Sequence, residues 1–238
     1  PFADCRLQPE IFAEISRKVL EIAVKKGISP YDEISNTGLL RHIFLRRGYH
    51  SGEIMICLVV RKNCRREIKS LAYEIVPLYP EIKTVVMNIN PDKTNVIMGK
   101  EIRLLYGSEQ IEDEIDGITF KISPLSFYQV NPVQTEKLYG TALEYAGLTG
   151  NETVWDVYCG IGTISLFLAQ KAKQVYGVEI VPQAIEDAKE NAKRNHITNA
   201  EFFVGKAEEV LPQKYEKEGI YADVIVVDPP RKGCDEAC

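Results

Sequence analysis

The sequence predicts an α/β protein in which a smaller α+β central domain precedes part of a doubly wound parallel sheet. Over residues 123–238, short apolar strands alternate with helical segments, which is typical of a parallel sheet with helices on both faces. Residues 1–122 also hold helices and strands, but two of the strands follow each other as a hairpin. A second hairpin near 110–122 closes this first part, so we place the domain boundary between residues 122 and 123.

The first domain is predicted to contain two helices and several strands. Residues 8–26 place apolar side chains at helical spacing and are followed by Gly27, and residues 67–78 repeat the pattern. The strands are predicted at 39–45, 53–60, 83–89 and 95–98. In the hairpin near 110–122, Asp116-Gly117 fits a type I′ turn, which needs positive φ at both central residues. We expect this hairpin to protrude.

The second domain is predicted to contain four strands and four helices in alternation. Asn131 and Pro132 resemble a helix cap followed by proline in the first turn. The predicted strands are 153–157, 174–179, 201–204 and 223–227, and the predicted helices are 132–146, 164–172, 182–195 and 207–211. Such a sheet leaves its last apolar strand at an edge, so we expect the sequence to be a fragment of a longer protein.

Composition excludes several classes of protein. The 238 residues are 45% hydrophobic and 26% charged with a net charge of −5, so a disordered or low-complexity chain is excluded. No apolar run approaches the length of a membrane span, so we expect no membrane partner. The six cysteines show no CxxC spacing, which favours a reduced, cytoplasmic location. No obligate protein partner is evident.

One segment is strongly basic in this acidic chain. Between Arg41 and Lys69 there are eight basic residues against Glu53 and Glu67. Phosphate contacts depend on local rather than total charge, so the segment is a candidate nucleic-acid surface. A solvated hairpin or helix end is the alternative that charge alone leaves open.

Two features of the second domain point to a nucleoside cofactor. In the segment Asp156–Gly162, Gly160 and Gly162 permit a tight turn and close approach of a ligand to the backbone. The third glycine of the dinucleotide fingerprint is replaced by Ser165. Glu179 ends the next strand, where a carboxylate can accept hydrogen bonds from ribose hydroxyls. A merely structural turn and an exposed acid are the alternatives.

Four segments in this order resemble the RNA uracil-C5 methyltransferase family. They are Ser126-Phe127-Tyr128-Gln129-Val130-Asn131-Pro132, Asp156-Val157-Tyr158-Cys159-Gly160-Ile161-Gly162-Thr163, Glu179 and Asp228-Pro229-Pro230-Arg231-Lys232-Gly233. The resemblance is close over residues 120–238 and looser before them. It implies a Rossmann-like methyltransferase sheet, S-adenosylmethionine as cofactor, and 23S rRNA or tRNA as partner, with 23S rRNA favoured. Amine-directed relatives carry an aromatic residue where this chain has Arg231, which disfavours amine methylation.

The resemblance also implies roles for single residues. The expected cofactor-binding residues are Gln129, Tyr158, Gly160, Gly162, Thr163, Glu179 and Asp228. The expected substrate-binding residues are Phe127 and Asn131 beside a flipped base, together with Arg46, Arg47, Arg65 and Arg66 from the basic segment. Cys5 resembles the last of four cysteines that hold a [4Fe–4S] cluster in many members. One cysteine cannot hold a cluster, so we expect a cluster in the full-length protein only.

The catalytic residues of the implied reaction are not expected in this sequence. Uracil C5 is a poor nucleophile, so a thiolate must first add to C6, and a base later removes the C5 proton. The family carries that cysteine in a Ser-Cys-Asn-Pro motif and the base on a later Glu, and neither motif occurs here. We therefore expect both beyond residue 238 and expect no turnover from this chain alone. An RNA methyltransferase of another specificity (cytosine C5 or a ring nitrogen) and a non-catalytic RNA-binding module are the alternatives.

Overall fold

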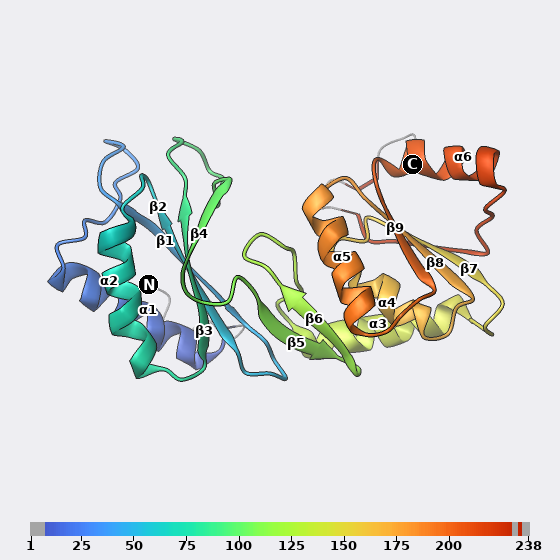
Figure 1. The fold of residues 1–238 in the computed structure, drawn as a ribbon, viewed down its shortest axis with the longest axis horizontal. Helices are drawn as coiled ribbons and strands as arrows, with labels where there is room; N and C mark the ends of the chain where they lie inside the picture. The colour runs from blue at the N-terminus through green and yellow to red at the C-terminus, as the bar shows by residue number, and fades with distance from the viewer. Residues whose placement is uncertain (1–7, 230–232, 235–238) are drawn as a thin grey trace. The chain divides into compact units, whose positions relative to one another are not determined.

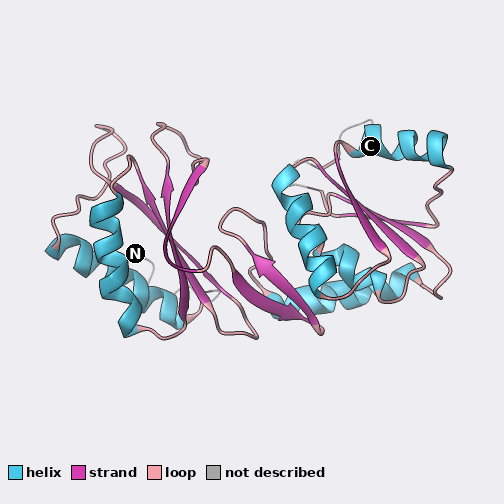
Figure 2. Cartoon of the chain, in the orientation of Figure 1, coloured by secondary structure: helices cyan, strands magenta, loops and turns pink. Residues whose placement is uncertain are grey.

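The computed structural model describes residues 8–229 and 233–234 (Figure 1). The fold is mixed α/β, which confirms the predicted class (Figure 2). The chain divides into two compact units. The first unit comprises the residues up to 113 together with 122–125, and the second unit comprises 114–121 together with the residues from 126 onward.

The first unit is built on a four-stranded sheet with two helices on one face. Its strands are ordered β1 (Leu40–Arg47), β2 (Ile54–Val60), β3 (Ile82–Ile89) and β4 (Glu101–Gly107). Strands β2 and β3 are parallel and the other two pairs are antiparallel. The helices are α1 (Glu10–Lys25) and α2 (Arg65–Ile75), and α2 continues into the 3-10 turn η1 (Val76–Leu78). The parallel pair needs a crossover, and α2 supplies it.

The core of the first unit lies between the sheet and the two helices. Every residue of β2 is buried. Ile15 and Val19 of α1 and Leu71 of α2 pack with the side chains of one face of β2 and β3. On the other face, Cys57 and Val86 lie beneath Phe44, Met98, Ile102 and Leu104. The central strand is therefore a continuous apolar run because both of its faces are covered.

The predicted strand at 95–98 is wrong, and the edge strand β4 lies a few residues later. The amide of Asn90 donates hydrogen bonds to the carbonyl oxygens of Val96 (2.7 Å) and Ile97 (3.1 Å). The buried side chain of Asn88 exchanges two hydrogen bonds with the backbone of Gly99, at 2.8 and 2.7 Å. These side chains satisfy backbone groups that a strand would pair with a neighbouring strand, so the segment forms a loop.

The hairpin of β5 (Ile111–Ile115) and β6 (Ile118–Ile122) has the predicted turn but does not protrude. Asp116 and Gly117 have φ values of 47° and 81°, which confirms the positive-φ turn. Ile115, Ile118 and Phe120 are buried in the core of the second unit. For this reason residues 114–121 belong to the second unit, whereas the sequence pattern predicts the whole hairpin before a boundary at 122/123.

The second unit contains a four-stranded, entirely parallel sheet. Its order is β10 (Val224–Val227), β7 (Thr153–Val157), β8 (Gln174–Glu179) and β9 (Ala200–Val204). The helices are α3 (Pro132–Ala146), α4 (Thr163–Ala169), α5 (Pro182–Arg194) and α6 (Ala207–Glu218). Because β10 pairs with β7 whereas β8 and β9 extend on the other side, the strand order reverses between β7 and β10. Ligands of open parallel sheets bind outside the carboxyl ends at such a switch point.

Helices cover both faces of this sheet. Val154 and Val175 pack against Leu168 of α4, whereas Trp155 and the alternate residues of β8 pack against α6. Helix α6 runs to Glu218, well beyond the predicted end at 211, although Pro212 lies inside it. Val210 and Leu211 pack against the cluster that contains Trp155, so tertiary packing offsets the cost of the proline. Within the residues that the structure describes, no helix is both long and apolar enough to cross a membrane.

Candidate functional site

The candidate site is the turn that joins β7 to α4 at the carboxyl edge of the parallel sheet. Tyr158, Gly160 and Gly162 all have positive φ, at 70°, 55° and 82°. The backbone N–H groups of Tyr158 and Cys159 both donate to the carbonyl oxygen of Val178 at 3.0 Å. A bulky residue with positive φ is a strained conformation that is typical of functional sites, so Tyr158 supports the importance of this turn.

The two glycines of the turn have different surroundings. A Cβ atom on Gly162 would lie 3.1 Å from the ring of Phe202 and 3.2 Å from Ala188. A Cβ atom on Gly160 would meet no atom of the described residues within 4 Å. Gly162 is therefore needed for packing between the turn, α5 and β9, whereas Gly160 borders open space where a ligand can reach the backbone.

Glu179, at the end of β8, is held beside this turn by two backbone hydrogen bonds. Its Oε1 accepts from the N–H of Val181 at 3.0 Å, and its Oε2 accepts from the N–H of Gly160 at 3.3 Å. The side chain is half-buried. The carboxylate is thus oriented before any ligand arrives, and each oxygen retains further capacity to accept a hydrogen bond.

Asp156 lies beneath the turn and is fully buried. Its Oδ2 accepts a hydrogen bond from the hydroxyl of Ser165 at 2.5 Å. Among the residues that the structure describes, Oδ1 has no hydrogen-bond partner. Burial raises the pKa of Asp156 to about 7, and the negative charges of Asp228 and Glu179 act in the same direction. A buried acid with an orphaned oxygen is typical of a functional site rather than of a passive core.

Thr163 and Asp228 complete the same edge of the sheet. The Thr163 hydroxyl is 3.0 Å from the hydroxyl of Tyr139 on α3. The N–H of Asp228 donates to the carbonyl of Val157 at 3.4 Å, which places Asp228 next to the start of the turn. Burial raises the pKa of Tyr139 to about 12, so this phenol stays protonated and can donate a hydrogen bond. Six of the seven predicted cofactor residues therefore lie in one region, namely Tyr158, Gly160, Gly162, Thr163, Glu179 and Asp228.

The segment before α3 is less closely tied to that region. The side chain of Asn131 accepts a hydrogen bond from the N–H of Gln134 at 3.3 Å and caps α3, so its carboxamide already has a structural role. The ring of Phe127 is 71% exposed. Gln129 is half-buried. An exposed aromatic ring on this loop is suitable for stacking on a base.

The four predicted RNA-binding arginines have different environments. Arg46 lies 5.1 Å from the Phe44 ring centroid and donates to the carbonyl of Pro124 at 3.4 Å. Its burial lowers the pKa to about 10. Arg65 donates to the carbonyl of Leu104 at 3.5 Å but is exposed, as are Arg47 and Arg66. The guanidinium of Arg46 therefore packs within the first unit, whereas the other three arginines are exposed; RNA binding by all four stays a prediction.

The predicted cluster ligand, Cys5, lies outside the described residues. Across residues 8–229 and 233–234, no group of three or more His, Cys, Asp or Glu side chains is arranged to hold a metal ion. Cys159 is buried beneath the turn, and burial raises the pKa of its thiol far above the usual range. The Cys159 side chain is therefore part of the packing rather than a nucleophile.

Two positioning residues were missed by sequence reasoning. The buried amide of Asn191 donates to the carbonyl of Ile161 in the turn at 3.2 Å and accepts from the N–H of Lys121 in β6 at 2.9 Å. It thereby links the turn to the hairpin. Tyr139 supports Thr163 from α3. Asn191 lies on the buried face of α5 together with Ile185 and Ala188, and a polar residue at such a position was the one usable signal.

The donor set fits an adenosyl cofactor. Glu179 offers carboxylate oxygens suited to ribose hydroxyls, and the open space at Gly160 admits a ligand against the backbone. The acidic residues at this edge disfavour an anionic pyrophosphate and favour a cationic sulfonium. S-adenosylmethionine matches these requirements better than a dinucleotide does.

The parallel sheet, the strained turn and the carboxylates at its edge define a Rossmann-like fold of the methyltransferase type. A family model described as a methyltransferase domain matches residues 148–232. Two relatives named uncharacterized RNA methyltransferase, from Bacillus cereus and Halalkalibacterium halodurans, are 57% and 54% identical over 98% of this chain. The chain covers 50% and 51% of these proteins, so it spans about half the length of the curated relatives it matches.

A solved structure resembles nearly the whole chain. It is the crystal structure of Pyrococcus abyssi tRNA (uracil-54, C5)-methyltransferase in complex with S-adenosyl-L-homocysteine. The two chains are 27% identical with a TM-score of 0.78, and the match covers 98% of this chain and 55% of the other. The similarity extends over both units, so the sequence resemblance that was looser before residue 120 is accompanied by a similar fold there.

Proposed function

We propose that this chain is the central and cofactor-binding part of an enzyme that methylates C5 of a uridine in RNA with S-adenosylmethionine. The observation that carries the proposal is the geometry of Glu179, whose two oxygens are fixed by the N–H groups of Gly160 and Val181. A carboxylate oriented in this way at the end of the second strand is suited to the ribose of an adenosyl cofactor.

In this proposal each residue of the edge has a role in binding. Glu179 accepts hydrogen bonds from the ribose, and Gly160 allows the cofactor to lie against the backbone. Tyr158, Thr163 and Asp228 are proposed to border the same space, and Gln129 of the loop before α3 is proposed as a further cofactor contact. The bound cofactor would supply an electrophilic methyl group on a sulfonium. Phe127 would contact the base that is drawn out of the RNA, because flipped bases are held by stacking.

The proposals that the substrate is RNA and that the target atom is uracil C5 are supported by similar proteins. The bacterial relatives carry the name RNA methyltransferase, and the archaeal enzyme of known structure is named for uracil C5. The motifs at 126–132 and 228–233 resemble the same family. We favour 23S rRNA over tRNA, as the sequence resemblance suggested, and a reduced cytoplasmic location. The nucleophilic Cys and the Glu that acts as the base are proposed to lie outside this sequence, since it contains no Ser-Cys-Asn-Pro motif.

The cofactor part of the proposal is tested by calorimetry with S-adenosylhomocysteine on the 238-residue chain. We expect Glu179→Ala to weaken binding at least tenfold, because hydrogen bonds to a charged group contribute about 1.5–3 kcal/mol. Glu201→Ala, an exposed acid on the neighbouring strand β9, is the matched control and should bind as the parent does. Equal affinity of the Glu179 variant and the parent would refute this site.

The specificity is tested with the protein encoded by the complete reading frame. That protein should form 5-methyluridine in 23S rRNA or tRNA, detected by nucleoside mass spectrometry. Methyl groups found on cytosine C5 or on a ring nitrogen would contradict uracil C5 while leaving the cofactor site intact.

A further inference from the structure

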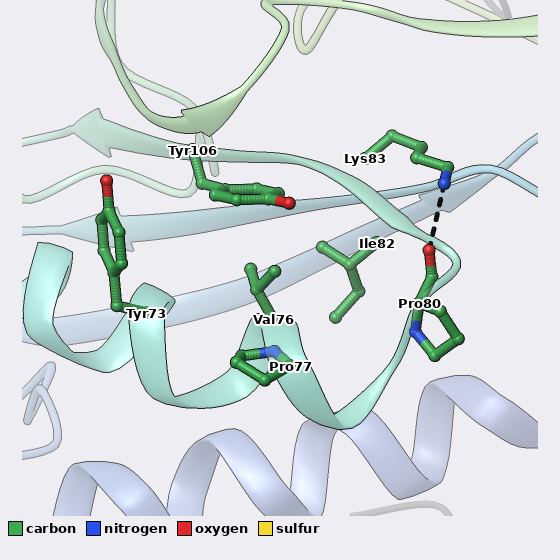
Figure 3. A pocket seen from close by; sticks show the side chains of 7 residues that line it. All are labelled: Tyr73, Val76, Pro77, Pro80, Ile82, Lys83 and Tyr106. Carbon is green, nitrogen blue, oxygen red and sulfur yellow. Dashed lines mark hydrogen bonds between the residues drawn. The ribbon is translucent and has the colours of Figure 1, made fainter.

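A pocket of about 390 Å³ lies in the first unit between helix α2 and the edge strand β4, and it is formed by residues of that unit alone. Its lining residues are Tyr73, Val76, Pro77, Pro80, Ile82, Lys83 and Tyr106 (Figure 3). The two tyrosine rings are nearly perpendicular, at 84°, with centroids 6.3 Å apart. Tyr73 is 55% exposed and Tyr106 is 36% exposed. The pocket therefore combines two partly exposed aromatic rings with apolar lining residues such as Val76 and Ile82.

An irregularity in the sheet directs Tyr106 into this pocket. Val86 of β3 pairs with Leu104 of β4, but Val85 pairs with Tyr106, so Leu105 is an extra residue in β4. Leu105 packs in the core beneath the helices. In a regular strand Tyr106 would share the opposite face with Leu104. Bulges of this kind re-aim a side chain and recur at functional positions.

The flank of α2 that faces β4 carries positive charge. The Nζ atom of Lys69 lies 5.5 Å from the centroid of the Tyr73 ring. Arg65, one helical turn earlier, reaches the carbonyl of Leu104, and Lys83 stands at the opposite rim, where it donates to the carbonyl of Pro80 at 3.1 Å (Figure 3). All three side chains are exposed. Arg65 and Lys69 on α2 and Lys83 on β3 together form the basic rim of the pocket.

Glu74, the acidic residue of α2 that follows Tyr73, is paired on the other side of the helix. Glu74 pairs with Lys25 at 3.2 Å and with Lys26 at 2.8 Å, both on the α1 side of the helix. Lys26 also donates to Ser70 at 2.8 Å. Positions 70 and 74 therefore face α1, whereas positions 65, 69 and 73 face β4, so the pocket side of the helix keeps its positive charge.

We propose that this pocket binds one unpaired base of an RNA strand, stacked on one of the rings of Tyr73 and Tyr106 and bordered by the other, while Arg65, Lys69 and Lys83 contact the adjacent phosphates. The inference deepens the proposed function and rests on its RNA substrate. Aromatic rings that accept bases, next to cations that follow the backbone, are the recurring chemistry of single-strand binding. Proline-rich peptides also bind to aromatic grooves. The basic rim of this pocket favours a polyanion such as RNA over such a peptide.

The test compares RNA affinity by fluorescence anisotropy with a labelled unpaired oligonucleotide and the 238-residue chain. Replacing both tyrosines (Tyr73→Ala with Tyr106→Ala) should weaken binding at least tenfold, because stacking contributes strongly for each base. Tyr73→Phe with Tyr106→Phe keeps both rings and should bind as the parent does. Tyr145→Ala removes a tyrosine that is 86% exposed on α3 of the second unit and is the control for loss of any surface aromatic ring.

A second variant keeps the test valid if the alanine variant folds poorly. Lys69→Gln with Lys83→Gln leaves the rings in place and should reduce the salt dependence of binding by about two phosphate contacts. Unchanged RNA affinity in the folded tyrosine-to-alanine variant, or an unchanged salt dependence in the lysine variant, would refute RNA binding in this pocket.

Affinity for S-adenosylhomocysteine separates the two proposals. It should be the same in the parent and in all pocket variants. If the parent and the variants bind RNA equally well, RNA binding in this pocket is refuted, whereas the proposed function is not. If the parent binds cofactor but no unpaired RNA, or binds a proline-rich peptide in this pocket instead, the RNA-binding role of the first unit fails.

Discussion

The loops that follow β3 and β7 both contain glycine and a neighbouring buried polar side chain, but the first loop is closed and the second is open to a ligand. Each follows a buried strand, and each is held by a buried polar side chain. After β3, Asn88 exchanges two hydrogen bonds with Gly99, and a Cβ atom on Gly99 would lie 1.9 Å from the carbonyl oxygen of Ile89. After β7, Asp156 keeps an oxygen without a partner among the described residues, and Gly160 borders open space.

The difference teaches how to tell a structural loop from a binding loop. The first loop closes on its own strand, where the side-chain amides of Asn88 and Asn90 donate hydrogen bonds to its backbone. The second loop is also held by a side-chain hydrogen bond, from Asn191, but it contains a strained Tyr158, and its Gly160 N–H holds the Glu179 carboxylate beside open space. Unsatisfied or strained groups persist where surrounding structure compensates for them.

The largest expected loss of stability from a single substitution is at Asn88. Asn88→Ala removes both hydrogen bonds to Gly99 from a fully buried position, so we expect a loss of about 3 kcal/mol in the free energy of unfolding. Urea denaturation measures it. Asn63→Ala, at an exposed position before α2, should cost less than about 1 kcal/mol. Cofactor affinity of the folded variant should not change, and a change would contradict a purely structural loop.

The second prediction concerns the pH dependence of stability at Asp156. Its pKa is about 7 when folded against 3.8 as the ordinary value. Between these values the folded protein holds a proton that the unfolded chain has released, so stability falls as pH rises by up to about 1.4 kcal/mol per pH unit. Below the lower value the stabilisation is fully present, and above about 7 the decline stops.

Asp156→Asn should remove this decline, because the amide oxygen can still accept from Ser165 but does not titrate. Urea denaturation from about pH 4.5 to about pH 8, a range that covers most of the interval between the two pKa values and passes the upper one, gives the two curves. The variant should gain on the parent as pH rises, and parallel curves would show that Asp156 titrates normally.

The smallest expected effect separates the two glycines of the turn. Gly162→Ala should cost about 1 kcal/mol more stability than Gly160→Ala, because only the former meets Phe202 and Ala188. Both variants share the cost of a side chain at positive φ. Affinity for S-adenosylhomocysteine should follow the reverse order, with the larger loss at Gly160. If both quantities fall together, the open space at Gly160 is not where the ligand binds.

Local patterns predicted the second unit better than the first. Strands 153–157 and 174–179 and helix 132–146 were predicted with their observed limits, because apolar periodicity, the Asn131 cap and Gly147 mark them clearly. Strand β4 was missed because its burial is partial and irregular, so its residues do not alternate as those of a regular strand do. The extent of α6 was missed because Pro212 normally ends a helix.

Within the candidate site, sequence reasoning named the residues that lie in the turn or end a strand, and their role in binding stays a prediction. Gly160, Gly162, Glu179 and Asp228 belong to short patterns whose chemistry can be recognised before folding. It did not find Tyr139, because a single tyrosine on a helix resembles any core residue. It also could not reveal the half-buried environment of Arg46, since charge in a sequence does not show whether a side chain lies over a ring such as Phe44.

The sequence by itself determined the alternation of strands and helices, the glycine turn and the carboxylates that follow the parallel strands, because each depends on neighbours within a few residues. Only the tertiary structure decided which groups meet. It set Glu179 against the N–H of Gly160, buried Asp156 until its pKa rose, and turned Tyr106 toward Tyr73 through the extra residue in β4. Burial and register are long-range properties, fixed by contacts between segments that are far apart in the chain.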